Sequence, residues 1–280
     1  MSSVDQVTVP LGPDSLTWQY FGDWRTYLMA PAAGIMQLML PGLGAGVTQH
    51  SNFFTEPWER IFRSVPQIAG VVYDGPEALA TAAKVRDYHR DIKGVDHNGR
   101  RYHALDPEVY HWAHATFLWA AMMTADIFDH PLTEAEQRRF YAEGKQWYRL
   151  YGVSERPMPA DWDGFRAYFD RVCTEELEVT EAAAWVVAQL DDPAEMQIPF
   201  VPDLVWRLFG KRFMREYRVV AAGTMPPAVR ERLGLPWGPL ERARFAALVQ
   251  LVRRVWPLLP ERVRYQPRAL AGFARERGAA

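Results

Sequence analysis

Apolar residues recur at three- and four-residue steps along most of the 280-residue chain, and no segment alternates convincingly between apolar and polar residues. Such steps place side chains on one face of an α-helix. Prolines and glycines separate the periodic segments, as is typical of connections between helices. The expected helices cover residues 24–40, 55–73, 75–94, 106–129, 133–151, 163–178, 180–190, 201–221, 226–233, 239–256 and 267–277.

This pattern predicts an all-α fold made of a single globular multi-helix domain over residues 24–280. Residues 1–23 are expected to be an extended N-terminal lead-in. Residues 41–54 are rich in glycine but lack the lysine of a phosphate-binding loop, so we expect a flexible connection there. Residues 95–105 are expected to form a polar, hairpin-like loop. No internal repeat or break in composition indicates a second domain.

The helix expected at residues 75–94 places a histidine on an apolar stripe, and Gly94 suits the position after its last turn. One interpretation is a core histidine that hydrogen-bonds to a backbone carbonyl. The other is a ligand presented into a helical pocket. Periodicity alone leaves both open. The residues that share this face are Leu79, Ala82, Arg86, His89 and Ile92.

The preceding helix, with Thr55 as its expected N-cap, carries Arg60, Arg63 and Ser64 at positions i, i+3 and i+4. These residues therefore share a face, and two guanidinium groups beside a hydroxyl can bind carboxylates or other anions. The apolar residues around them indicate a largely buried helix, in which arginines need partners. The alternative is a solvated basic face.

The helix expected at residues 106–129 carries His111 and His114 one turn apart, after Asp106 as N-cap. A His-x-x-His pair on a helix can bind a metal ion. The chain has no HExxH and no Glu-x-x-His motif here, so structural hydrogen bonding is favoured over metal ligation for both histidines.

The composition is unusual in its 11 Trp, 12 Tyr, 14 Phe and 10 Met. Such side chains suit a pocket for a bulky planar or apolar ligand, or simply an aromatic-rich core. A net charge of −2 gives no electrostatic case for nucleic acid as a partner.

Cys173 is the only cysteine, which excludes an intrachain disulfide and any cysteine-based metal cluster and suits a reducing compartment. The first residues lack the pattern of a secretory signal. Prolines and glycines interrupt the apolar run at residues 27–47, which is therefore a poor membrane span. We expect a cytoplasmic protein without an integral membrane segment.

The histidine on an apolar stripe, the Arg/Arg/Ser face and the aromatic side chains together suit a b-type haem. Such a cofactor takes one neutral imidazole on its iron, cationic side chains for its propionates or for an anionic oxygen species, and an apolar slot.

The succession PWERIFRS, YDGPEALATAAKVRDYHRDIKG, YHALDPEVYHWAHATF and PLTEAEQRRFYAEGKQW resembles the MpaB and rubber-oxygenase (latex clearing protein) catalytic domain family. The resemblance covers roughly residues 25–260. It implies an all-helical haem b oxygenase. Some members of that family cleave double bonds of polyisoprenoid chains with O₂, giving aldehyde or ketone ends, and need no nicotinamide or flavin.

The resemblance implies roles for five residues of this chain. His89 matches the proximal iron ligand, and Arg60 matches an arginine that lines the haem pocket. Arg63 stands where rubber oxygenases have a lysine that can cap the iron, and Ser64 replaces a threonine. His114 matches a recurrent histidine of the family.

Two departures from the family pattern change what the resemblance implies. Arg63 offers no lone pair, so the distal side of the iron should be open or occupied by water. The carboxylate proposed as distal base in rubber oxygenases would fall at residues 42–46, where this chain has none. Rubber as the substrate does not follow from the resemblance.

The sequence therefore predicts a haem b-dependent oxygenase that uses O₂ on a small lipophilic, unsaturated, isoprenoid-like substrate. His89 would bind the iron, and Arg60 and Arg63 would stabilise developing charge or anchor propionates. Alternatives are a haem-binding sensor, a peroxidase-like or other oxidative enzyme, and a cofactor-free helical lipid-binding domain. A further one is a metallohydrolase using His103, Asp106, His111 and His114. The sequence leaves the oligomeric state open.

Overall fold

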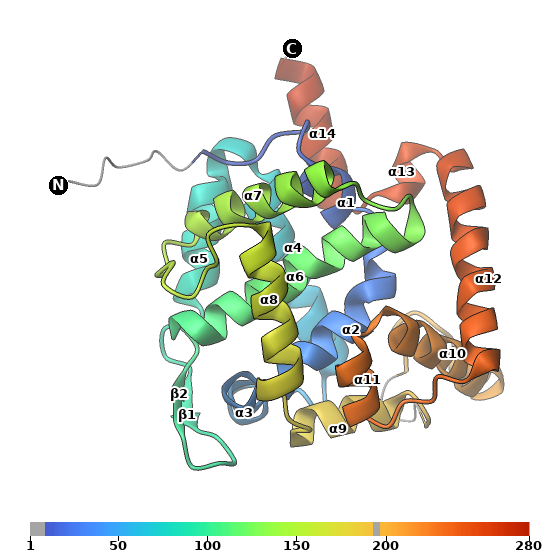
Figure 1. Cartoon of the computed structure of the whole chain (residues 1–280). Coiled ribbons are helices and arrows are strands. Elements are labelled where there is room, and N and C mark those ends of the chain that lie inside the picture. The colour runs from blue at the N-terminus through green and yellow to red at the C-terminus, as the bar shows by residue number, and fades with distance from the viewer. Residues whose placement is uncertain (1–8, 193–196, 280) are drawn as a thin grey trace.

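The computed structural model describes residues 9–192 and 197–279, and nearly all of its regular structure is helical (Figure 1). The prediction of an all-α fold is confirmed. The helices are α1 (Leu16–Phe21), α2 (Thr26–Met39), α3 (Pro41–His50), α4 (Pro57–Tyr73), α5 (Ala78–Asp87), α6 (Pro107–Phe128), α7 (Glu134–Leu150), α8 (Trp162–Arg171), α9 (Glu181–Gln189), α10 (Asp203–Thr224), α11 (Pro227–Arg232), α12 (Pro239–Val255), α13 (Glu261–Arg264) and α14 (Pro267–Ala279).

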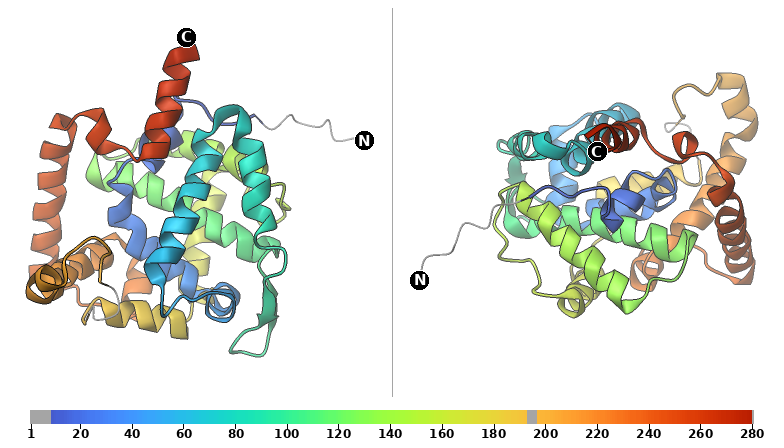
Figure 2. Two further views of the ribbon diagram at one scale, coloured as in Figure 1. Left: turned by 180° about the vertical axis from the view of Figure 1, so that it is seen from behind. Right: turned by 90° about the horizontal axis from the view of Figure 1, so that it is seen from above.

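Helix α6 runs through the middle of the molecule, and α1, α2, α7 and α12 pack against it (Figures 1 and 2). Its start is fixed as the sequence predicts, because the side chain of Asp106 accepts a hydrogen bond from the Glu108 amide. The Trp112 indole is fully buried and donates to the Met36 carbonyl of α2 at 3.0 Å. The most apolar helices thus form the centre of the fold.

Aromatic side chains fill this centre. Many of the large residues that the composition singled out pack against one another inside the core, so they account for the fold before any ligand is considered. The largest fully buried aromatic side chains are Trp18, Trp112, Trp147, Tyr73, Tyr148, Phe128, Phe140 and Phe165.

The predicted helix ends are confirmed where the residues that form the cap are close in sequence. Thr133 and Glu136 form the predicted capping box at the start of α7, and Gly152 follows its end with φ of +64°. The N-cap of α4 is Glu56, however, and Thr55 lies in the turn before it, so that predicted cap is wrong. Pro57 occupies the first turn as expected.

Two predicted connections are helical instead. Residues 16–21 of the predicted lead-in form α1, because the buried carboxylate of Glu143 accepts hydrogen bonds from the amides of Leu16 and Thr17 at 3.1 and 2.8 Å. Residues 1–8 of that lead-in lie outside the described residues. The glycine-rich segment forms α3, where Gly44 packs so closely on the Leu38 carbonyl that no Cβ would fit.

The helix predicted at residues 75–94 is shorter than expected. A 3₁₀ turn over Gly75–Glu77 leads into α5, and α5 ends at Asp87. Gly94 lies in strand β1 (Lys93–Val95), which pairs antiparallel with β2 (Arg101–His103) and confirms the hairpin-like loop. A Cβ at Gly94 would lie close to the side-chain oxygen of Gln49 on α3, and Gly94 does not end the helix.

The described residues contain no single helix that has both the length and the apolar character to cross a membrane. Helices α2 and α3 reach that length only together, as a pair bent by 96°.

A buried ion pair joins the N-terminal and C-terminal parts of the fold. Asp23 is fully buried, and its carboxylate accepts from Arg25 Nε at 3.1 Å and Nη2 at 2.9 Å. The Trp256 indole donates to the same carboxylate at 3.1 Å, and Arg25 also donates to the Phe128 carbonyl. The Arg25 side chain therefore pairs with the buried carboxylate of Asp23 and also donates a hydrogen bond to a backbone carbonyl at the end of α6.

We expect Arg25→Met to lower the free energy of unfolding by about 3–5 kcal/mol, because it leaves the Asp23 carboxylate buried without its cation. Urea denaturation at neutral pH measures this. Arg262→Met, at an exposed position of α13, should change the value by less than about 0.5 kcal/mol. Equal effects of the two substitutions would contradict this role for Arg25.

Candidate functional site

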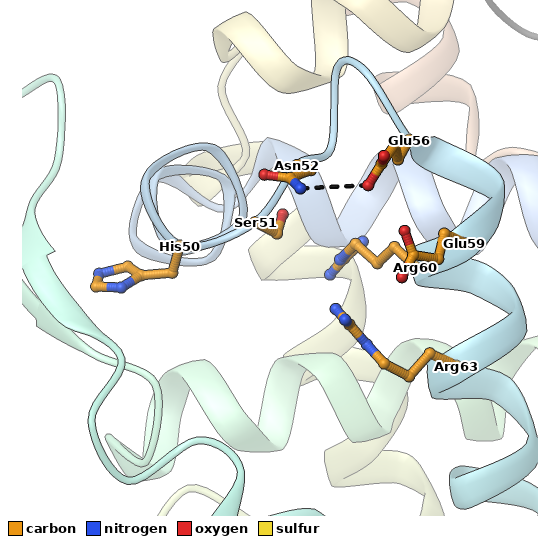
Figure 3. Close-up of a pocket in the computed structure, with 7 residues that line it drawn as sticks. All are labelled: His50, Ser51, Asn52, Glu56, Glu59, Arg60 and Arg63. Atoms are coloured by element: carbon orange, nitrogen blue, oxygen red, sulfur yellow. Dashed lines mark hydrogen bonds between the residues drawn. The ribbon is translucent and has the colours of Figure 1, made fainter.

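A pocket of about 190 Å³ lies between the end of α3 and the start of α4 (Figure 3). Two of the predicted site residues reach it from successive turns of α4. The lining residues are His50, Ser51, Asn52, Glu56, Glu59, Arg60 and Arg63.

The guanidinium groups of Arg60 and Arg63 extend side by side from α4 into this pocket (Figure 3). Within residues 9–192 and 197–279, neither makes an ion pair or a hydrogen bond, and the Arg60 guanidinium lies 5.7 Å from the centre of the Phe53 ring. Burial and the charge of Arg63 lower the pKa of Arg60. Two cations held together in this way favour an anion between them.

The two carboxylates at the pocket interact mainly with groups other than the arginines. Glu56 accepts a hydrogen bond from the Asn52 side-chain amide at 3.2 Å, which lowers the pKa of Glu56. The hydrogen bond and negative charge of Glu56 raise the pKa of Glu59. The pocket is therefore lined by two carboxylates as well as two guanidinium groups, and neither guanidinium is held in an ion pair with a described residue.

Helix α4 is less buried than its apolar sequence predicts. Its buried residues are Pro57 and the last turn at residues 69–73, whereas Phe62 and Arg63 are exposed. Ser64 is half-buried on the same side of the helix as Arg60 but does not line the pocket. The prediction of a largely buried helix holds only for its second half.

His89 follows the end of α5, and its ring is fixed by a single hydrogen bond. Its Nδ1 lies 2.8 Å from the Val85 carbonyl, so Nδ1 carries the proton and Nε2 carries the lone pair. The ring is half-buried and meets the Tyr110 ring edge-on at 5.8 Å. Burial, followed by the positive charge of Arg60, lowers the pKa of His89. The geometry thus yields a neutral imidazole near Arg60.

His114 lies elsewhere. Its Nε2 is 2.9 Å from the Gly144 carbonyl, and its ring packs on Trp147 and Tyr148 of α7 at 4.8 and 5.1 Å. The structure therefore does not bring His114 to the pocket of Arg60 and Arg63. It places this histidine in the packing between α6 and α7, as the structural interpretation predicts.

His111 is also buried, with its ring centroid 4.9 Å from that of Tyr168, and its Nδ1 has no hydrogen-bond partner in the described part of the chain. Burial lowers the pKa of His111 to about 4 and that of His114 to about 3. Both histidines are therefore neutral in the fold at neutral pH.

Three of the four residues of the metallohydrolase alternative bond to separate parts of the fold. His103 Nε2 lies 2.9 Å from the Arg90 carbonyl, and its Nδ1 accepts from the Leu105 amide. Asp106 caps α6, and His114 bonds to α7. The described ranges contain no group of three or more His, Cys, Asp or Glu side chains placed to hold a metal ion.

Sequence reasoning missed three aromatic residues around the site. Phe53 lies under the Arg60 guanidinium, and Tyr110 meets His89. The Trp58 indole nitrogen is buried and has no hydrogen-bond partner in the described structure. Periodicity could place Tyr110 and Trp58 on helices but could not show which residues they contact.

The donor atoms of His89, Arg60 and Arg63 suit a haem, and His89 does not itself line the pocket of the two arginines. A neutral histidine whose Nδ1 is held by a carbonyl is the usual form of an iron-ligating imidazole. The Arg60 and Arg63 guanidiniums match propionate carboxylates. The pocket itself, at about 190 Å³, is below the roughly 300–1,000 Å³ of sites that enclose a larger ligand, so it accommodates an anionic group rather than a whole macrocycle.

Comparison with known proteins gives two findings. A family model described as "ER-bound oxygenase mpaB/B'/Rubber oxygenase, catalytic domain" matches residues 18–254. The chain is also similar to two uncharacterised proteins, from Mycobacterium tuberculosis and Mycobacterium bovis. Each is 27% identical over 244 residues, covering 84% of this chain and 91% of the relative. No solved structure matches.

We expect acid to destabilise the fold through His111 and His114. Between pH 6.5 and about 4, these histidines are protonated in the unfolded chain but not in the folded one. The free energy of unfolding should therefore fall as pH falls, by about 1.4 kcal/mol per pH unit for each histidine.

Denaturant titrations at several pH values measure this slope. His114→Gln should reduce the slope by about 1.4 kcal/mol per pH unit, the contribution of one histidine. A His114→Gln slope equal to that of the natural protein would exclude this origin of acid sensitivity.

Proposed function

Because the chain belongs to the mpaB and rubber-oxygenase catalytic-domain family, we propose that it is a haem b-dependent oxygenase. We propose that it uses O₂ on a small lipophilic, unsaturated, isoprenoid-like substrate. The observation that carries the proposal is the arrangement of His89: a half-buried neutral imidazole, oriented by the Val85 carbonyl, in the field of Arg60.

His89 is the residue proposed to bind the haem iron. The Val85 carbonyl holds the proton on Nδ1, which leaves the Nε2 lone pair for a metal. Burial and the nearby cation disfavour imidazolium, so the ligand is ready at neutral pH. Haem b, when bound, supplies the one-electron and O₂ chemistry that amino-acid side chains lack.

Arg60 and Arg63 are proposed to hold negative charge in the site. A guanidinium without a carboxylate partner can anchor a propionate or stabilise charge that develops during the reaction. Arg60 is the more enclosed of the two, and Phe53 faces its guanidinium. Ser64 can contribute a hydroxyl from the same side of α4, whereas His114 is better explained as a structural residue.

Binding of the whole macrocycle must widen the present pocket. The first half of α4 has few buried residues, whereas its last turn, residues 69–73, is buried against the core. A segment with few buried contacts opens at low cost. We therefore expect the start of α4 to move when haem binds. The turn after α5, which bears His89, should stay in place.

Absorption spectra test the cofactor. Protein produced with ample haem should show a Soret band and contain haem b in the pyridine hemochrome assay. His89→Ala should abolish or strongly shift that band, because it removes the proposed iron ligand. His97→Ala, at an exposed position of the hairpin, should leave it unchanged. A colourless natural protein would refute haem binding.

Oxygen uptake tests the reaction and separates an oxygenase from a haem sensor or a peroxidase-like enzyme. Haem-loaded protein should consume O₂ with squalene, a polyunsaturated isoprenoid, but not with its saturated analogue squalane. One O₂ is consumed for each double bond cleaved, and each new carbonyl receives one of its oxygen atoms.

Arg60→Leu should lower turnover per bound haem by about 10²–10³-fold, the usual loss on removing a group that stabilises developing charge. Arg100→Leu, on the exposed hairpin, serves as the control. Haem binding without substrate-dependent O₂ uptake would instead favour the sensor or peroxidase-like alternatives.

A further inference from the structure

The start of α10 presents large apolar side chains to solvent on one side of the helix. Leu208 and Phe209 are 66% and 60% exposed, and Leu204 and Val205 are also exposed. The buried residues of this helix begin at Gly210 and lie mainly in its second half. Figure 2 (right) shows the first turns of α10 standing away from the body of the molecule.

Phe200, just before α10, extends this apolar surface. It is 92% exposed and has a φ of +79°, a left-handed conformation that costs free energy for a residue with a side chain. Its ring lies 6.1 Å from that of Phe62 on α4, which is also exposed. We name this surface the α10 patch; its residues are Phe62, Phe200, Leu204, Val205, Leu208 and Phe209.

Cationic side chains accompany the α10 patch. Arg207 lies within it, and Lys211, Arg212 and Arg215 follow it within two turns, all exposed. The Lys211 Nζ forms an ion pair with the Asp192 carboxylate at 3.4 Å. Arg207, Arg212 and Arg215 have no ion pair within the described ranges, so their charges are free to meet an anionic partner.

We propose that the α10 patch docks this protein on the surface of an anionic lipid bilayer. Apolar side chains at the start of α10 would enter the boundary between headgroups and acyl chains. Arg207, Arg212 and Arg215 would lie at the level of the lipid phosphates, where each cation strengthens binding.

The positive charge beside the α10 patch favours a bilayer, rather than a second copy of the chain, as the partner that covers the patch. A two-fold contact between two α10 patches would set the same unpaired arginines against each other. A membrane instead supplies anionic groups to all of them together. Docking goes beyond the proposed oxygenase function and does not depend on it, because Phe62 is two residues from Arg60 and so points to another side of α4.

Sedimentation with vesicles tests the proposal. The purified protein, as isolated, should bind vesicles of phosphatidylcholine mixed with phosphatidylglycerol, bind less at high salt, and bind little to phosphatidylcholine alone. Leu208→Asp combined with Phe209→Asp should remove binding. Arg212→Ala combined with Arg215→Ala should weaken it about 30-fold, since each cation near an anionic surface is worth roughly 1 kcal/mol.

Matched variants control for general effects of charge. Leu258→Asp, at an 80% exposed site beyond the end of α12, and the pair Arg254→Ala with Arg262→Ala should bind as the natural protein does. Circular dichroism and melting curves check that each variant is folded, and the Soret band reports the haem site separately.

Three results would overturn the docking proposal. One is no binding of the natural protein to anionic vesicles. Another is equal binding by the Leu208/Phe209 variant. The third is a dimer in sedimentation equilibrium that this variant converts to a monomer without any vesicle affinity in either form, which would show that a second copy covers the patch.

Discussion

Two guanidinium groups share a pocket at the start of α4 without an ion pair to any described residue, and these unpaired cations set the chemistry of the site. Burial of Arg60 and the positive charge of the exposed Arg63 both lower the pKa of Arg60. An anion between them would relieve both effects. The fold therefore maintains a site whose missing partner is negative, while the nearby carboxylates of Glu56 and Glu59 interact with each other and with Asn52.

The same positive charge acts on His89. Burial and the field of Arg60 both disfavour its protonated form, and the Val85 carbonyl selects which nitrogen keeps the proton. The structure thus has an anion site at Arg60 and Arg63 and, outside the lining of that pocket, an available imidazole lone pair at His89. A haem uses both kinds of attachment. Family membership makes an oxygenase the natural interpretation, and haem as the cofactor remains our proposal.

Sequence patterns predicted those parts of the fold whose partners lie within a few residues. The Thr133–Glu136 capping box, the Asp106 cap and the Arg60–Arg63 spacing are examples. Contacts distant in sequence decided the rest. Glu143 stabilises α1 from α7, and Gly94 pairs with Tyr102 of β2 instead of ending a helix. His114 shows what a sequence cannot predict about the site. The hydrogen-bond partner of its ring is the backbone carbonyl of Gly144, and no side-chain motif reveals a backbone partner.

A crystal structure of the haem-reconstituted protein tests the central claim most directly. The account predicts iron bound to His89 Nε2, with Nδ1 still on the Val85 carbonyl, and carboxylate or another anion at Arg60 and Arg63. It also predicts that the start of α4 has moved outward while the buried last turn, residues 69–73, has not. Iron held by another residue, or a macrocycle bound away from these two arginines, would contradict it.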